Sequence, residues 1–133
     1  MKIGICGTGK MGSEIAKRLI ESNQEITVWN RTLSKASLLI DHGAKVASNI
    51  SELVKHNDII LCILGNDIAL DYVYSSTDGF KNNNLSNKVI IELSTTSVEK
   101  IQSLQQIITK LNGEFLECPV GGSTKPARDG NLL

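Results

Sequence analysis

The sequence has no excess charge of either sign and no long apolar run. Its 133 residues include 14 Lys and Arg against 14 Asp and Glu, so the formal net charge at pH 7 is zero. A balanced charge leaves no electrostatic footprint for nucleic acid or for an acidic membrane surface. No stretch approaches the roughly 18 apolar residues of a membrane helix, and the chain begins directly with a strand-like segment instead of a signal sequence. We therefore expect a soluble, cytoplasmic protein without nucleic-acid or membrane partners.

Patterns for metal binding and acid–base chemistry are also lacking. The three cysteines, Cys6, Cys62 and Cys118, are widely spaced, and each lies within or at the end of an apolar, strand-like run. This spacing predicts buried, reduced thiols and no metal site. Of the two histidines, His42 is expected to end a helix and His56 to precede a strand. Both would then lie away from the strand ends at which ligands bind, as surface residues and not as an acid–base pair.

A glycine-rich loop is the first positive indication of a ligand. An apolar strand at residues 2–6 leads into residues 7–12, GTGKMG, and apolar residues at helical spacing follow. Gly7 would allow a sharp turn, Gly9 the approach of a pyrophosphate, and Gly12 close packing of the helix on the sheet. The helix N-terminus would direct free N–H groups at the phosphates. A strand, turn and helix of purely structural role would have a similar sequence. The predicted cofactor-binding residues here are Gly7, Thr8, Gly9, Lys10, Met11 and Gly12.

The end of the second predicted strand, 26–29, indicates which dinucleotide is bound. An NAD-binding unit usually carries an Asp or Glu here for the ribose 2′-hydroxyl, but this chain has Asn-Arg-Thr at 30–32. Arg31 and its neighbours supply hydrogen-bond donors and positive charge, which a 2′-phosphate requires, and Arg31 could also stack on the adenine ring. The alternative is that Arg31 and Lys35 are solvated charges at the start of a helix that Thr32 caps. We predict that the cofactor is NADP, bound by Asn30, Arg31, Thr32 and Lys35.

Strand-like and helix-like segments alternate along the whole chain, without a linker or a repeat. This alternation predicts a doubly wound, Rossmann-type α/β fold with a parallel sheet. The length suits one core, so we expect residues 1–133 to be a single NADP-binding domain. The apolar run at 59–64 predicts a central strand buried on both faces. Further strands are predicted at 45–47, 89–93 and 114–118, and helices at 33–42, from about 51, at 67–75, and from a capping box at 96–99 to Gly113.

Ligands of such a sheet bind at the carboxyl ends of its strands. Five segments are expected there and should line one crevice, namely residues 7–11, 30–32, 64–67, 94–96 and 119–123. Leu64 therefore joins the predicted cofactor-binding residues. Thr95 is predicted to contact the nicotinamide ribose or the substrate, with capping of the following helix as the alternative role of residues 94–96.

The sequence resembles the β-hydroxyacid dehydrogenases along its whole length. The matching segments are the glycine loop, residues 30–32 with Lys35, ELST at 92–95, and ECPVGGS at 117–123. The family includes 3-hydroxyisobutyrate dehydrogenases and glyoxylate or succinic semialdehyde reductases, and its cofactor domain is similar to that of 6-phosphogluconate dehydrogenase. Ser123 and residues 125–127 are most similar to the glyoxylate and succinic semialdehyde reductase branch. The resemblance implies an oxidoreductase that transfers hydride between NADPH and a small hydroxyacid or semialdehyde.

The resemblance also implies a site for a small carboxylate substrate. In the family a Ser-Gly-Gly segment offers backbone and hydroxyl donors to the substrate carboxylate. Here Gly121 stands in the place of the serine, Gly122 follows, and Ser123 could supply the missing hydroxyl. The predicted substrate-binding residues are Thr95, Gly121, Gly122 and Ser123.

The family's general acid is a lysine on a helix beyond this segment, just before an all-helical domain that forms the dimer. The chain ends at Leu133 without either, and Leu132 and Leu133 resemble the start of a strand. We therefore predict no catalytic residue within it, cofactor binding with little or no turnover, and homo-oligomers only together with the helical domain. Two alternatives stay open: an imine reductase-like NADPH domain, which is similar around residues 28–32, and a non-catalytic NADPH-binding module.

Overall fold

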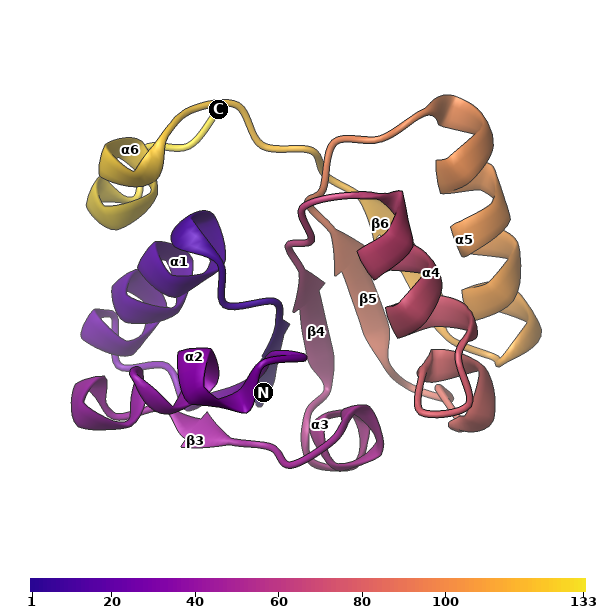
Figure 1. Cartoon of the computed structure of the whole chain (residues 1–133), viewed down its shortest axis with the longest axis horizontal. Coiled ribbons are helices and arrows are strands. Elements are labelled where there is room, and N and C mark those ends of the chain that lie inside the picture. Colours follow the sequence, from indigo (N-terminus) through magenta and orange to yellow (C-terminus); the bar gives the residue numbers. More distant parts are fainter.

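The computed structural model describes all residues, 1–133, and is built on one six-stranded parallel sheet (Figure 1). The strand order is β3-β2-β1-β4-β5-β6, so the chain winds outward from β1 in both directions. The strands are β1 (Ile3–Cys6), β2 (Ile26–Trp29), β3 (Lys45–Val46), β4 (Ile59–Cys62), β5 (Val89–Glu92) and β6 (Glu114–Glu117). The helices are α1 (Lys10–Glu21), α2 (Leu33–Ser37), α3 (Ile50–His56), α4 (Asp67–Ser75), α5 (Val98–Lys110) and α6 (Thr124–Asp129). The predicted doubly wound α/β fold is confirmed.

Side chains alternate between the two faces of the sheet and form two cores. On one face Ile60, Cys62 and Ile90 pack against α3, α4 and α5 in a cluster of 16 buried residues. On the other face Ile5 and Val28 pack with α1, α2 and Ala127 of α6 in a cluster of 9. Figure 1 shows the resulting division, with α1 and α6 to the left of the sheet and α4 and α5 to the right. The second core is smaller because no helix of this chain covers its face over β5 and β6.

The prediction that β4 is buried on both faces is therefore only half correct. Its place between β1 and β5 is central, and Ile60 has no exposed surface. Leu61, one residue on, points to the other face and is only partly buried, as is Ile91 beside it in register. On the edge strand Leu116 is 50% exposed. Apolar composition predicted the centre of the sheet correctly but could not show how far the helices extend over it.

The two faces of β4 should respond differently to truncation. Ile60→Ala is expected to lower the free energy of unfolding by about 2–5 kcal/mol because it leaves a cavity in a closed core. Leu61→Ala should cost only about 1–2 kcal/mol, since a half-buried side chain loses less apolar contact. Urea unfolding of the two variants makes the comparison within one strand. Equal losses would contradict the difference in coverage between the faces.

Two predicted helices differ in their bounds. The helix expected at 33–42 is divided into α2 and a separate 3₁₀ turn at Ile40–His42, which Gly43 ends with φ 102°. The Ser37 hydroxyl donates to the carbonyl of Leu33 at 3.1 Å, a local bond that competes with helix continuation. Helix α5 begins one residue later than the predicted capping box, because Ser97 and not Thr96 accepts from a backbone N–H, that of Lys100.

The cysteines and histidines are distributed as follows. Cys6 and Cys62 are buried side by side in register on β1 and β4, as predicted, whereas Cys118 is exposed. The prediction for Cys118 was wrong because it follows an edge strand with no neighbour on one side. His42 and His56 are both exposed. No cluster of metal-ligating side chains is present, and none of the helices has the length and apolarity required to cross a membrane.

Candidate functional site

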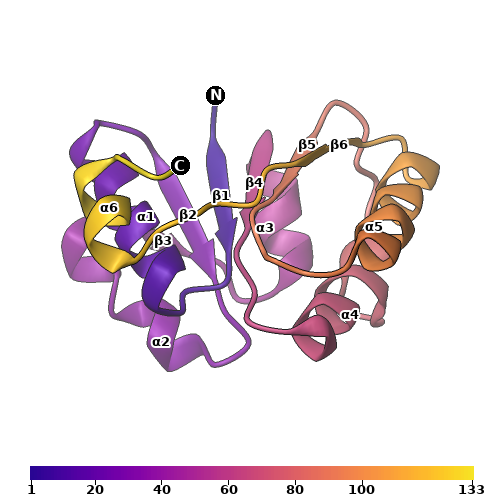
Figure 2. The same cartoon turned by 90° about the horizontal axis from the view of Figure 1, so that it is seen from above.

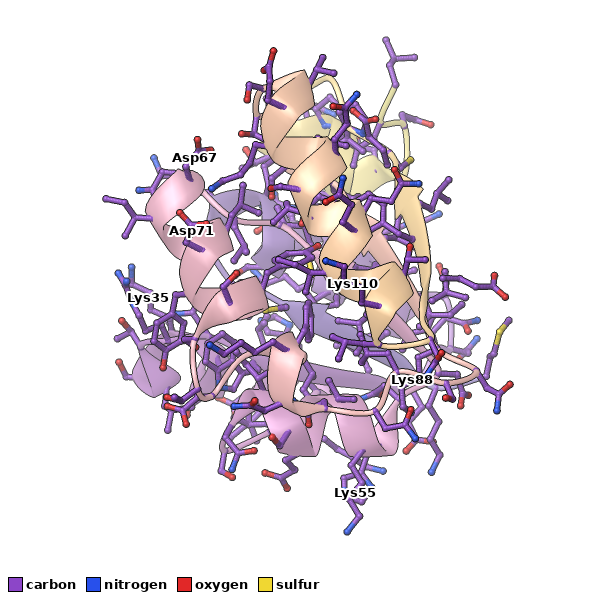
Figure 3. The ribbon with its side chains drawn as sticks, turned by 90° about the vertical axis from the view of Figure 1, so that its right-hand side faces the viewer. Lys35, Lys55, Asp67, Asp71, Lys88 and Lys110 are labelled. Carbon is purple, nitrogen blue, oxygen red and sulfur yellow. The ribbon has the colours of Figure 1, made fainter.

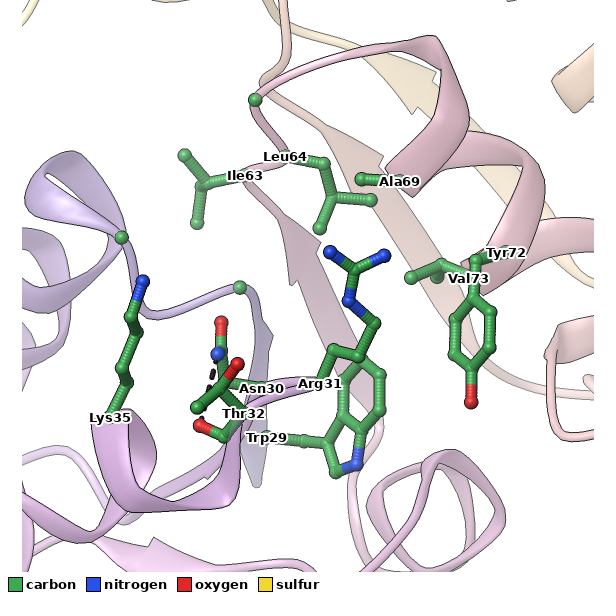
Figure 4. Close-up of a pocket in the computed structure, with 13 residues that line it drawn as sticks. Trp29, Asn30, Arg31, Thr32, Lys35, Ile63, Leu64, Ala69, Tyr72 and Val73 are labelled. Atoms are coloured by element: carbon green, nitrogen blue, oxygen red, sulfur yellow. Dashed lines mark hydrogen bonds between the residues drawn. The ribbon is translucent and has the colours of Figure 1, made fainter.

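A cleft opens at the carboxyl ends of β1, β2 and β4, where the predicted cofactor segments meet (Figure 4). One wall comes from the glycine loop and the end of β2, and the other from the end of β4 and from α4. Of the predicted cofactor-binding residues, Gly7, Gly9, Asn30, Arg31, Thr32, Lys35 and Leu64 line it. The structure adds Trp29, Ile63, Gly65, Ala69, Tyr72 and Val73. The expectation that five segments line one crevice holds for three of them, because residues 94–96 and 119–123, with Thr95 and Gly121 to Ser123, lie outside this cleft.

Glycine stands at the three positions of the loop for different structural reasons. Gly7 has φ 104°, and a Cβ there would lie 2.2 Å from the Ile63 carbonyl oxygen. A Cβ on Gly12 would lie 2.0 Å from the carbonyl oxygen of Gly7, because α1 packs directly on the turn. A Cβ on Gly9 would meet no atom within 4 Å. The fold therefore requires Gly7 and Gly12, whereas Gly9 keeps open the space in front of the N-terminus of α1.

The remaining loop residues differ in their surroundings. The backbone N–H of Thr8 donates to the Asn30 side chain at 3.0 Å, while its own hydroxyl is buried without a partner. Lys10 is the exposed first residue of α1, where a cation opposes the helix dipole unless an anion is near. Met11 is partly buried against the second core and so serves packing.

Adjacent residues at the end of β2 have different roles, one structural and the others available to a ligand. Asn30 accepts from the Thr8 N–H and donates through Nδ2 to the Thr32 carbonyl at 3.1 Å, so its amide ties the loop to the strand. Thr32 stands at the N-cap of α2, but its hydroxyl makes no capping bond. Arg31 and Lys35 are exposed and take part in none of the five ion pairs of the structure. Two cations and one hydroxyl are therefore free at this edge of the cleft.

The opposite wall is apolar. In Figure 4 the guanidinium of Arg31 points toward Leu64 and Ala69. Tyr72 of α4 stacks on Trp29 of β2 with ring centroids 6.4 Å apart and planes at 3°. This aromatic pair joins the two walls and could not be expected from the sequence, because the rings are 43 positions apart and no periodic pattern relates them. The cleft thus offers a flat apolar surface beside free positive charge.

These observations fit the predicted dinucleotide. Gly9 leaves a cradle that a side chain would fill, the Thr8 hydroxyl is an orphaned buried polar group, and Arg31 with Lys35 provides unpaired charge for a phosphate. The apolar wall suits an adenine ring.

The predicted substrate segment crosses above the sheet from β6 to α6 (Figure 2). Gly121 and Leu133 exchange two backbone hydrogen bonds, at 2.6 and 3.2 Å, so residue 133 pairs with the segment although neither residue belongs to a strand. The N–H of Gly121 is thereby engaged. Gly122 has φ 130°, a conformation that favours glycine. Ser123 is exposed at the N-cap position of α6 and its hydroxyl makes no capping bond.

Helix α6, which the sequence patterns did not reveal, fixes this segment to the glycine-loop helix. Arg128 Nε donates to Glu14 Oε2 at 2.6 Å, and Ala127 is buried against α1. The hydrogen bond from Arg128 lowers the pKa of Glu14 below its ordinary value, with Lys17 adding to the effect. The one sequence feature that could have indicated this contact is Glu14, an acidic residue on the buried face of α1 that needs a cationic partner.

The sequence matches a known protein family over nearly its whole length. The model for the NAD binding domain of 6-phosphogluconate dehydrogenase matches residues 2–133. The chain belongs to this family. It is therefore an NAD(P)-binding domain of dehydrogenase and reductase type, and the resemblance to the β-hydroxyacid dehydrogenases is confirmed.

Two curated proteins are similar to essentially the whole chain. Glyoxylate/succinic semialdehyde reductase 1 of Arabidopsis thaliana is 35% identical over 133 residues, which are 100% of this chain and 46% of the reductase. The cytokine-like nuclear factor N-PAC of Danio rerio is 37% identical, over 99% of this chain and 29% of the relative. The chain thus spans less than half the length of these relatives.

A solved structure, Psf3 in complex with NADP+ and 2-OPP, superposes with a TM-score of 0.92 at 29% identity. The match covers 98% of this chain and 46% of Psf3. The family relationship and the superposition agree on the same fold for the domain.

Proposed function

We propose that this domain binds NADPH in preference to NADH and serves hydride transfer between NADPH and a small hydroxyacid or semialdehyde. The observation that carries the cofactor preference is the pair of free cations, Arg31 and Lys35, at the end of β2, where no carboxylate is present to accept a ribose hydroxyl. The NADP+ complex of Psf3, which has the same fold, supports this choice.

Different residues of the cleft would bind different parts of the cofactor. Gly9 and the N-terminus of α1 would hold the pyrophosphate, and the Thr8 hydroxyl would bond to it. Arg31, Thr32 and Lys35 would hold the 2′-phosphate, with the adenine between the Arg31 guanidinium and the apolar wall that includes Leu64. Thr95, exposed at the end of β5, would contact the nicotinamide ribose. When bound, the nicotinamide supplies the hydride, and the protein orients it.

The substrate we propose is a short carboxylate of the glyoxylate, succinic semialdehyde or 3-hydroxyisobutyrate type. Its support is the similarity to the Arabidopsis reductase together with the free hydroxyl of Ser123. Because the N–H of Gly121 is engaged by Leu133, Gly122 and Ser123 would provide the donors to the carboxylate. The proton donor would be the lysine that the family resemblance places on a helix just before the all-helical domain, and that domain would form the homo-oligomer.

The test is a calorimetric titration of the 133-residue chain with NADPH and, separately, with NADH. We expect NADPH to bind and NADH to bind at least about tenfold more weakly, a difference of about 1.4 kcal/mol. Equal affinities would overturn the NADP preference while leaving the cofactor site. Absence of heat with both ligands, confirmed by an unchanged melting temperature in excess ligand, would contradict the cofactor site itself.

A further inference from the structure

Glu92, the last residue of β5, is a buried carboxyl with several donors around it. Its side chain has no exposed surface. Oε2 accepts from the Tyr74 hydroxyl of α4 at 2.6 Å, and Oε1 accepts from the Ser94 backbone N–H at 2.8 Å. The hydroxyl oxygen of Ser94 accepts in turn from the Leu64 N–H at 2.8 Å. One carboxyl thus connects α4, the segment after β5 and the segment after β4.

No cation compensates this carboxyl. Glu92 belongs to none of the ion pairs of the structure, and the neighbouring titratable groups are the buried Tyr74 and Cys62. Burial raises the pKa of Glu92, and hydrogen bonds from Ser94 and Tyr74 oppose that rise. A buried acid held only by neutral donors is costly for a fold to keep, so its placement at the carboxyl end of β5 calls for a reason beyond packing.

The segment after β5 depends on this carboxyl for its position. The last ladder bond of the strand runs from the Leu93 N–H to the Cys62 carbonyl, and the next backbone bond is that from Ser94 to Glu92. The Ser94 hydroxyl also accepts from the Leu64 N–H, and further along the Thr96 hydroxyl donates to Asp67 at 2.6 Å. Figure 3 shows Asp67 near the start of α4, one turn before Asp71. Thr95 is exposed between these two attachment points.

The segment after β4 has other supports. The Ile63 N–H donates to the Cys6 carbonyl at 2.9 Å, and the Asn66 side chain caps α4 by accepting from the Ala69 N–H. The adenine wall of the cleft therefore has supports that do not involve Glu92, whereas the Ser94 backbone next to Thr95 is bonded to the Glu92 carboxyl.

We propose that Glu92 is a positioning residue that fixes Ser94, and through it Thr95, at the nicotinamide end of the cofactor site. The inference rests on the proposed function, because it requires that NADPH lies in the cleft with its nicotinamide toward the end of β5. Glu92 acts as a hydrogen-bond acceptor toward Ser94 and does not touch the cofactor.

The test compares two ligands that share the adenosine end. NADPH reaches Thr95, whereas adenosine 2′,5′-bisphosphate carries the adenine and two phosphates but no nicotinamide. Glu92→Leu removes both acceptor oxygens, and we expect it to weaken NADPH about tenfold, the effect of one lost hydrogen bond, with the bisphosphate unchanged within about twofold. Glu92→Gln keeps an acceptor for Ser94 and can donate to Tyr74, so it should retain NADPH affinity within about threefold.

Two further variants separate positioning from stability. The double change Glu92→Leu with Tyr74→Phe leaves no unpaired hydroxyl and should recover the melting temperature but not the NADPH affinity. Asn57→Leu replaces another fully buried polar side chain, which bonds to the Leu53 carbonyl at the opposite edge of the sheet. It should change the melting temperature and neither dissociation constant. If the leucine variants do not fold, Glu92→Asp, which shortens the reach to Ser94, should show the same ligand selectivity.

The outcomes separate the two proposals. A wild-type chain that binds neither ligand contradicts the proposed function. If the wild-type chain binds both ligands, the proposed function stands. The role of Glu92 is then overturned if its variants change the dissociation constants of both ligands by the same factor, or change neither.

Discussion

Gly9→Ala is expected to leave the domain folded while weakening NADPH by about 5- to 150-fold, the effect of about 1–3 kcal/mol of overpacking against the ligand. The added Cβ would meet no protein atom within 4 Å, so it costs the free chain nothing in contacts. It would instead occupy the space in front of α1 where a pyrophosphate would approach the backbone. Thermal unfolding and calorimetric titration of the same sample measure the two effects.

Gly12→Ala is the matched control from the same loop. Its Cβ would lie 2.0 Å from the carbonyl oxygen of Gly7, so α1 must move away from the sheet. This variant should lose stability and NADPH binding together. A Gly9→Ala variant that binds NADPH as tightly as the wild type would show that the loop serves the architecture only and that the cofactor does not approach it.

Arg31→Ala is expected to weaken NADPH by about 10- to 150-fold, because it removes a charge-assisted hydrogen bond of about 1.5–3 kcal/mol to the 2′-phosphate. The side chain is exposed and forms no ion pair, so its loss should not affect folding. Titration with NADH provides the comparison within the same variant. NADH lacks the 2′-phosphate and should lose only the smaller contribution of adenine stacking on Arg31, so its affinity should fall much less than that of NADPH.

The two ligands together decide the role of Arg31. A parallel loss for NADH would assign Arg31 to adenine stacking instead of phosphate recognition. Unchanged affinity for NADPH would remove Arg31 from the site. Leu33→Ala is a suitable surface control, because Leu33 begins the neighbouring helix and is itself 44% exposed.

The sheet and most of the cleft were predictable because local sequence determines them. The positive φ of Gly7 and the contact that a Cβ on Gly12 would make with the Gly7 carbonyl both arise within one turn, and the apolar run of β4 identifies a central strand. The carboxyl-end rule then places residues 30–32 and Leu64 beside the loop without any knowledge of side-chain geometry.

The features that sequence reasoning missed all depend on residues far apart in the chain. The stacking of Tyr72 on Trp29, the bond between Arg128 and Glu14, and the acceptance by Glu92 of the Tyr74 hydroxyl each join separate elements. No periodic pattern encodes such pairs. The position of the α5 cap was missed for the same reason, because the hydroxyl of Thr96 is drawn to Asp67 on another helix.

Asn30 and Arg31 divide the structural role from the proposed choice of cofactor between two adjacent residues. The Asn30 amide is committed to the architecture through its bonds to the backbone of Thr8 and Thr32. Its neighbour Arg31 makes no bond that the structure needs. A substitution at position 31 should therefore cost the fold little stability. Selection for a different nicotinamide dinucleotide can act there while the hydrogen bonds of Asn30 keep the turn in place. Related domains could therefore change their specificity between NADP and NAD through single substitutions at this position.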